Sequence, residues 1–199
     1  MCRVYCCKTY IAVALLMGAL VVQGAQPVQA EPAKTSIQPL AVAGVGSVIP
    51  GTGTILVRTK EGVGMTMHSF GLVPGNAYTA WFGIFNNPQA CATTPCSAAD
   101  FMNPHVRGVV LNATGQIAGE DGTADFGAFR AVDDTAGQAG VGTAMALERP
   151  LRAEIHLVVR SHGPAALDDP DLLQAQLSMF NGGCPPSDCI NVQVAPHLP

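Results

Sequence analysis

The most regular alternation of apolar and polar positions in the chain covers residues 153–163, AEIHLVVRSHG. Side chains of a β-strand point alternately to its two faces, so this segment separates aliphatic from titratable side chains. The aliphatic face comprises Ala153, Ile155, Leu157 and Val159, and the polar face comprises Glu154, His156, Arg160 and His162. We therefore predict a strand with one buried face and one face that is available for chemistry or binding.

Other segments alternate over shorter lengths and predict a mostly β domain. These further strands are residues 52–60, 62–70, 78–85, 106–113, 116–119, 123–130 and 190–194. Turn residues at 120–122 predict a hairpin that joins 116–119 to 123–130. Residues 131–143 are predicted to form a loop, and residues 144–148 fit either a short helix or the start of a strand.

One short helix is predicted near the C-terminus, after the segment Asp168-Asp169-Pro170-Asp171. An aspartate suits the N-cap, proline suits the first turn, and a further acidic residue there interacts favourably with the helix dipole. Together with the strands, this helix predicts an antiparallel β-sandwich of about seven or eight strands.

The N-terminus has the features of a signal peptide over residues 1–30. Arg3 and Lys8 precede an apolar run, residues 11–22, and small residues near Ala30 suit a cleavage site. We expect a flexible lead-in at 31–40, a single folded domain at 41–199, and a secreted or periplasmic product without a membrane span after the leader is removed.

Composition narrows the class of partner. The 199 residues are 48% hydrophobic and 12% charged, with 22 glycines and 15 prolines, which fits one folded domain with many turns. Without its leader the chain has 8 basic and 14 acidic residues, a formal charge of −6. Nucleic acid is excluded as an expected partner because phosphate binding requires a basic surface. A small ligand, a metal ion or a protein stays open.

Four cysteines follow the leader, namely Cys91, Cys96, Cys184 and Cys189. An even number in an exported chain predicts two disulfides. Each pair encloses four residues including proline, which favours local pairing within each loop, although pairing between the loops stays open. A zinc site made of the four thiolates is a further alternative.

Two ligand sites are candidates on the polar face of residues 153–163. Arg160 and His162 near the end of the strand suit a carboxylate or phosphate, with His156 farther along the same face. The alternative is that Arg160 pairs with Asp168 or Asp169.

Glu154 and His156 lie about 7 Å apart along a strand and could share a copper or zinc ion with His68. The neighbours of His68, Met65 and Met67, suit a soft metal. Equally, these methionines could face the core while His68 faces solvent.

Catalysis has weaker support. The sequence has no Gly-x-Ser-x-Gly motif, and its cysteines are expected to be oxidised. Glu154 and His156 could serve as an acid and base, which leaves a hydrolase as the third hypothesis.

The segment Leu72-Val73-Pro74-Gly75-Asn76-Ala77-Tyr78 leads into an aromatic strand. It resembles the tyrosine corner of fibronectin type III and other immunoglobulin-like sandwiches, in which the tyrosine hydroxyl bonds to the backbone of the preceding turn. The aromatic strand ending in Asn86-Asn87-Pro88, the paired cysteine loops and residues 153–163 also resemble a group of uncharacterised bacterial secreted proteins. These resemblances imply export and an immunoglobulin-like fold.

Our leading hypothesis is an exported, disulfide-stabilised β-sandwich that acts as a non-catalytic binding or structural module, for which no cofactor is expected. The alternative is a periplasmic or extracellular copper- or zinc-binding protein that uses His68, Glu154 and His156, with redox activity left open.

Overall fold

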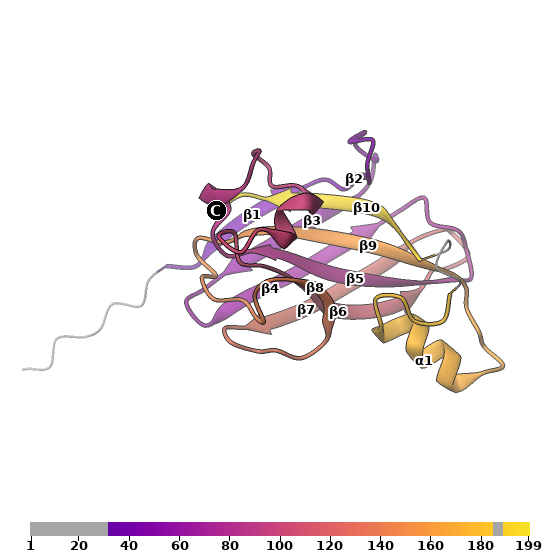
Figure 1. The fold of residues 1–199 in the computed structure, drawn as a ribbon. Helices are drawn as coiled ribbons and strands as arrows, with labels where there is room; N and C mark the ends of the chain where they lie inside the picture. Colours follow the sequence, from indigo (N-terminus) through magenta and orange to yellow (C-terminus); the bar gives the residue numbers. More distant parts are fainter. Residues whose placement is uncertain (1–31, 185–188) are drawn as a thin grey trace, which may run out of the picture. The chain divides into compact units, whose positions relative to one another are not determined.

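Two antiparallel β-sheets form the frame of the protein (Figure 1). The computed structural model describes residues 32–184 and 189–199, and the signal-peptide prediction lies outside them. Sheet A has the order β1 (Lys34–Gln38), β3 (Gly53–Arg58), β4 (Gly62–Ser69) and β7 (Ala124–Ala131). Sheet B has the order β2 (Ala41–Val42), β10 (Ile190–His197), β9 (Glu154–Pro164), β5 (Asn76–Phe85), β6 (Gly108–Ile117) and β8 (Gln138–Gly142).

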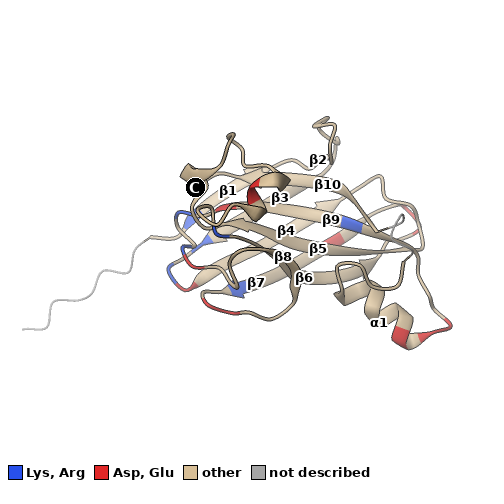
Figure 2. Ribbon diagram, in the orientation of Figure 1, with Lys and Arg blue, Asp and Glu red and all other residues tan. Residues whose placement is uncertain are grey.

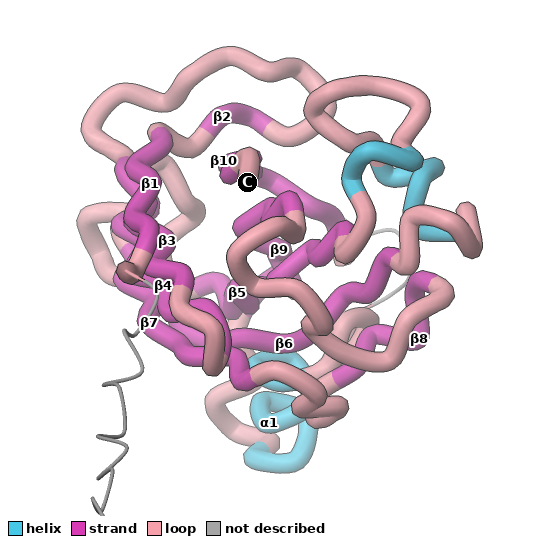
Figure 3. The backbone as a smooth tube through the Cα atoms, turned by 90° about the vertical axis from the view of Figure 1, so that its left-hand side faces the viewer, coloured by secondary structure: helices cyan, strands magenta, loops and turns pink. Residues whose placement is uncertain are grey.

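One hydrophobic core is shared by the two sheets, in a sandwich-like arrangement. Leu56 and Met65 enter it from sheet A, and Phe82 and Leu157 enter it from sheet B, each at most 3% exposed. Seen along the strands in Figure 3, sheet A runs down one side and α1 (Pro170–Ser178) lies outside sheet B. The mostly β architecture and the short C-terminal helix are therefore confirmed.

Strand β9 confirms the predicted alternation. Residues Ala153, Ile155, Leu157 and Val159 are fully buried in the shared core. β9 is hydrogen-bonded to β5 along one edge and to β10 along the other, so it is an interior strand of sheet B. The polar side chains of β9 therefore lie together on the outer face of that sheet.

Three strands were not predicted, namely β1, β2 and β8. β1 pairs with β3 from Lys34 opposite Arg58 to Gln38 opposite Thr54, so the expectation of a flexible lead-in at 31–40 is wrong. The physical reason is that these strands lie at sheet edges, where few side chains are fully buried and a strand therefore needs little apolar alternation.

The predicted hairpin around 120–122 is also wrong in its pairing. The turn is present, with Gly119 N–H donating to Thr123 O over 2.9 Å. The strands on either side separate, however, because β6 pairs with β5 in sheet B and β7 pairs with β4 in sheet A. The turn therefore connects the two sheets.

Several local predictions hold. The backbone N–H of Val73 donates to the Tyr78 hydroxyl over 2.9 Å, which is the bond expected of a tyrosine corner. Asp169 caps α1 by accepting from Leu172 N–H over 3.0 Å. Both disulfides are local, Cys91–Cys96 and Cys184–Cys189. No helix in the described part of the chain has the length and apolar character needed to span a membrane.

Charge is concentrated away from the middle of the sheets. Figure 2 shows most acidic and basic residues in loops and near strand ends, whereas the central strands of sheet B are nearly free of them. β9 is the exception, because it contains both Glu154 and Arg160. These two charged residues lie on the same outer face.

Candidate functional site

The outer face of sheet B is covered at both ends and hollow between them. At one end the segment around η2 (Ala98–Met102) packs over Gly83 and Gly108. At the other end α1 and the residues after it pack over β6, where a Cβ on Gly115 would lie 2.2 Å from Leu177 O. The polar face of β9 therefore lies in a recess between two coverings and does not form a flat surface.

A cavity of about 660 Å³ lies between these two coverings. Four aromatic side chains line it, namely Trp81, Phe85, Phe101 and Phe180. Its polar side chains are His156, Arg160 and Asn191. Stacking of Phe85 on Phe101, with ring centroids 4.4 Å apart, and the edge-to-face contact of Trp81 with Phe180 at 4.9 Å give the cavity defined aromatic walls.

Glu154 orients His156 inside this cavity. One carboxylate oxygen, Oε1, accepts from His156 Nε2 over 2.7 Å and from the backbone N–H of Cys96 over 2.7 Å. Glu154 is 2% exposed, so the disulfide loop covers the carboxylate and leaves the imidazole as the accessible member of the pair. His156 Nε2 donates to Glu154, and no described residue bonds to the other ring nitrogen, Nδ1.

The Glu154–His156 pair has the form that activates a nucleophile or a water molecule. A hydrolase also needs the nucleophile itself within hydrogen-bond distance of the imidazole. Among the described residues, no serine, threonine or cysteine side chain hydrogen-bonds to His156. The pair therefore supplies an oriented hydrogen-bonding group in the cavity, and the hydrolase hypothesis gains no nucleophile among the described residues.

Arg160 lies at the α1 end of the cavity and is 8% exposed. Its Nε donates to Phe180 O over 2.6 Å, and its terminal nitrogens donate to Asn191 Oδ1 and Asn181 Oδ1, each over 2.8 Å. The guanidinium also stacks on the Phe180 ring at 4.0 Å. All these partners are neutral, and burial lowers the pKa of Arg160 from its usual value.

Within the described residues Arg160 has no ion pair with a carboxylate. The predicted alternative, in which Asp168 or Asp169 neutralises Arg160, is therefore not what the structure has. Arginine has five N–H donors, and the three described acceptors use only part of this capacity. Among the described residues, Arg160 is therefore a buried cation with spare donors beside a cavity.

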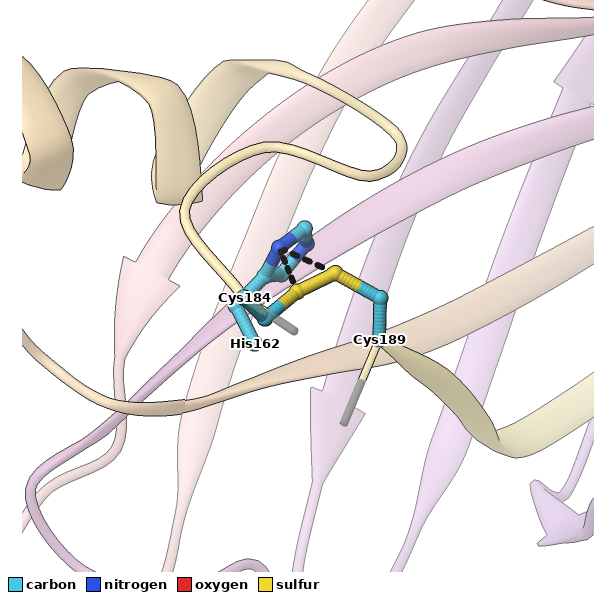
Figure 4. A group of neighbouring side chains, drawn as sticks. All are labelled: His162, Cys184 and Cys189. Atoms are coloured by element: carbon cyan, nitrogen blue, oxygen red, sulfur yellow. Dashed lines mark hydrogen bonds between the residues drawn. A yellow bond between two sulfur atoms is a disulfide. The ribbon is translucent and has the colours of Figure 1, made fainter. Parts of the chain in front are cut away.

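His162 lies outside this cavity, under the loop that contains the second disulfide. Its Nε2 bonds to Thr79 Oγ1 over 2.8 Å, and its Nδ1 donates to Gly182 O over 2.9 Å. Nδ1 also lies 3.5 Å from both sulfur atoms of Cys184–Cys189 (Figure 4). Burial lowers the pKa of His162, so the ring is neutral at pH 7. The structure therefore brings two of the three predicted ligand-binding residues, His156 and Arg160, into one cavity.

The predicted metal set of His68, Glu154 and His156 is wrong. His68 lies on β4 in sheet A, with an exposed side chain that bonds to Asp125 Oδ1 over 2.7 Å. Glu154 and His156 lie on the outer face of sheet B, so the shared core separates them from His68. Met65 and Met67 face that core, at 3% and 2% exposure, which confirms the structural interpretation of the Met-Thr-Met-His segment.

Several residues of the site were not predicted. Trp81 and Phe85 lie on β5, whereas Phe101 lies in η2 and Phe180 in the turn after α1, where the sequence shows no regular pattern. The spacing of Cys184 and Cys189 predicts their disulfide. It does not predict that His162 lies beside the two sulfur atoms. No protein-family model, curated protein or solved structure matches the chain.

Proposed function

We propose that the protein is an exported, non-catalytic binding protein whose cavity on sheet B holds a small amphipathic anion. The apolar body of the ligand packs against the aromatic walls, and its anionic group lies at Arg160. The observation that supports this most directly is the buried guanidinium beside an aromatic cavity, with neutral partners throughout the described residues.

The dimensions and lining of the cavity support a small-molecule ligand. Binding sites for small molecules measure about 300–1,000 Å³ and are mostly apolar, with a few polar groups that fix the orientation of the ligand. A volume of about 660 Å³ with four aromatic walls and three polar side chains fits this description. The ligand class is therefore a compact molecule with an aromatic or aliphatic body.

Electrostatics supports the negative charge of the ligand. A cation taken out of water loses hydration energy, and neutral hydrogen-bond partners recover only part of it. A carboxylate, sulfonate or phosphate at Arg160 would use its spare donors and neutralise its charge. His156 Nδ1 would hydrogen-bond to a hydroxyl group on the same ligand.

Export and the finer fold assignment belong to the same proposal. The leader sequence and the two local disulfides support an oxidising compartment, secreted or periplasmic. The Tyr78 hydroxyl bond supports an immunoglobulin-like relationship within the wider class of β-sandwiches.

Two fluorescent probes with one aromatic skeleton test the proposal. N-phenyl-1-naphthylamine is neutral, and 8-anilinonaphthalene-1-sulfonate adds an anionic group to the same rings. We expect both to bind in the cavity and the sulfonate to bind more tightly. Arg160→Met should reduce the preference for the sulfonate about 10- to 100-fold, the range that a hydrogen bond to a charged group contributes.

A cavity-filling variant supplies the control. Val158 is half-buried in β9 and lines the cavity, so Val158→Trp should abolish the binding of both probes. Val57→Trp places the same side chain on the outer face of sheet A and should leave binding unchanged. The proposal is wrong if neither probe binds, or if folded Val158→Trp, checked by near-UV circular dichroism, binds both probes as the parent does.

A further inference from the structure

A histidine and two cysteines converge outside the proposed binding cavity. His162 Nδ1 and the sulfur atoms of Cys184 and Cys189 all lie within 4.8 Å of one another. In the described part of the chain this is the only group of three histidine, cysteine or acidic side chains with such an arrangement. Figure 4 shows the imidazole lying against both sulfur atoms.

We propose that reduction of the Cys184–Cys189 disulfide creates a binding site for one Zn(II) ion, with His162 Nδ1 and the two thiolates as ligands. The oxidised protein does not bind the ion, because the sulfur atoms are joined to each other. The site is therefore controlled by thiol redox chemistry, and its three ligands lie outside the anion-binding cavity.

The observed distances match the geometry of such a site. Zinc bonds of about 2.3 Å to sulfur and about 2.05 Å to nitrogen, at tetrahedral angles, place nitrogen and sulfur ligands about 3.5 Å apart. His162 Nδ1 already lies 3.5 Å from each sulfur. Only the two sulfur atoms must separate, to about 3.8 Å, and the Cα atoms of the cysteines are 5.8 Å apart. Three protein ligands leave the fourth position for water.

The chemistry balances with a dithiol reductant. The disulfide accepts two electrons and two protons from the reductant, which becomes a disulfide, and the protein gains two thiols. Zn(II) then displaces one proton from each thiol. In the free protein, Nδ1 carries the proton that it donates to Gly182 O. When the ion binds, Nδ1 loses this proton and Nε2 gains one, so the imidazole stays neutral. Binding one Zn(II) therefore releases two protons.

The surroundings of His162 hold the ring in place for this role. Trp81 Nε1 donates to Thr79 Oγ1 over 2.6 Å, and Thr79 Oγ1 bonds to His162 Nε2 over 2.8 Å. A metal-binding histidine usually has its second nitrogen held by an oxygen atom, which fixes the ring orientation. Thr79 and His162 are both at most 2% exposed, so the position of the ring is set before the ion binds.

The first disulfide provides an internal comparison. Cys91 and Cys96 have the same sequence separation as Cys184 and Cys189 and form the same local loop. No described histidine or acidic side chain completes a group of three with them. In the described residues, the Cys91 and Cys96 pair therefore has no imidazole nitrogen or carboxylate oxygen within 4.8 Å of both sulfur atoms.

The experiment uses two full-length variants with matched cysteine content. In the first, Cys2, Cys6, Cys7, Cys91 and Cys96 are replaced by serine. In the second, Cys2, Cys6, Cys7, Cys184 and Cys189 are replaced. Each is reduced with a dithiol, freed of reductant without oxygen, and titrated with Co(II) as a spectroscopic substitute for Zn(II). We expect a thiolate-to-cobalt charge-transfer band at one equivalent in the first variant only, bleached by Zn(II) and absent before reduction.

Adding His162→Gln to the first variant tests the imidazole. We expect Zn(II) affinity to fall more than about 100-fold, beyond the 10- to 100-fold effect of residues that only orient a ligand. The proposal is overturned if His162→Gln binds as tightly as its parent, or if the second variant binds equally well. It is also overturned if the reduced first variant binds no ion, including the case in which it unfolds and Zn(II) does not restore its near-UV circular dichroism.

Discussion

His197 shows how one buried ring couples folding to pH. It is fully buried, its Nδ1 bonds to Ser36 Oγ over 2.7 Å, and its Nε2 bonds to Thr54 Oγ1 over 2.8 Å. Desolvation, followed by repulsion from Arg58 and His156, lowers the pKa of His197 from 6.5 to about 4. The folded protein therefore holds this ring neutral where the unfolded chain would bind a proton.

This difference predicts a loss of stability in mild acid. Above pH 6.5 the ring is neutral in both states. As the pH falls from 6.5 to about 4, His197 becomes protonated in the unfolded chain and stays neutral in the folded protein. The free energy of unfolding therefore falls by about 3 kcal/mol. Urea unfolding across this range, compared between the parent and His197→Asn, measures the effect. His197→Asn should flatten the profile, whereas His105→Asn, at an exposed position, should leave its slope unchanged.

Individual residues also show where sequence patterns reach their limit. Alternation places His68 on the face opposite Met65 and Met67, which is right, but it does not say which sheet contains the strand. Glu154 and His156 were assigned to one face correctly, because neighbours two positions apart on a strand always share a face. Joining His68 to them required the relation between two sheets, which depends on contacts between segments far apart in the sequence.

At the scale of elements, helix α1 lies tightly on β6. Gly115 has no side chain where the backbone of Leu177 passes, and a Cβ there would lie 2.2 Å from the Leu177 carbonyl oxygen. Backbone atoms cannot move aside as the end of a flexible side chain can. The helix, and with it the Phe180 wall of the cavity, therefore depends on glycine at this position.

Gly115→Ala should consequently displace α1. We expect the free energy of unfolding to fall by about 1–3 kcal/mol, the usual cost of overpacking, and naphthyl-probe binding to weaken because Phe180 moves. Gly127→Ala in β7 is the control, since the nearest atom to its added Cβ would be 3.9 Å away, and we expect a change within about 0.5 kcal/mol. Equal unfolding midpoints for the two variants would contradict the close approach of α1 to β6.

The elements that the sequence predicts well are those with a large buried face. β3, β4, β5, β7, β9 and β10 show alternation or continuous apolar character, and Asp169-Pro170 marks the start of α1. The edge strands β1, β2 and β8 are short and partly exposed, so their sequences resemble loops. The coverings of sheet B were unpredictable for another reason, because η2 and Phe180 are placed by tertiary packing.

At the scale of the whole molecule, Arg58 ties the two sheets together. It belongs to β3 in sheet A and is 2% exposed. Its terminal nitrogens donate to the carbonyl oxygens of Ala153 over 2.6 Å and Pro150 and His197 over 2.9 Å each, next to or within the strands of sheet B. Burial lowers the pKa of Arg58 to about 10, although attraction from Glu154 opposes the change, so the side chain is charged at pH 7.

Removing this link should destabilise the protein as a unit. Arg58→Met leaves buried carbonyl oxygens without donors, and each such loss costs about 1–3 kcal/mol, so we expect the free energy of unfolding to fall by at least about 3 kcal/mol. Thermal or urea unfolding measures this. Arg149→Met, at an exposed arginine, should change stability by less than about 0.5 kcal/mol. A comparable small change in Arg58→Met would show that the carbonyl bonds contribute little.

The position of the cavity on the outer face of sheet B has a consequence for ligand preference. Its side walls come from residues of the coverings, such as Phe101 in η2 and Phe180 after α1, while the sandwich core lies on the other side of β9 and β5. On the proposed function, substitutions at Phe101 or Phe180 would change which ligand the cavity holds without altering the side chains of the shared core. The part of the molecule that would set ligand preference is thus separate in space from the part that stabilises the fold.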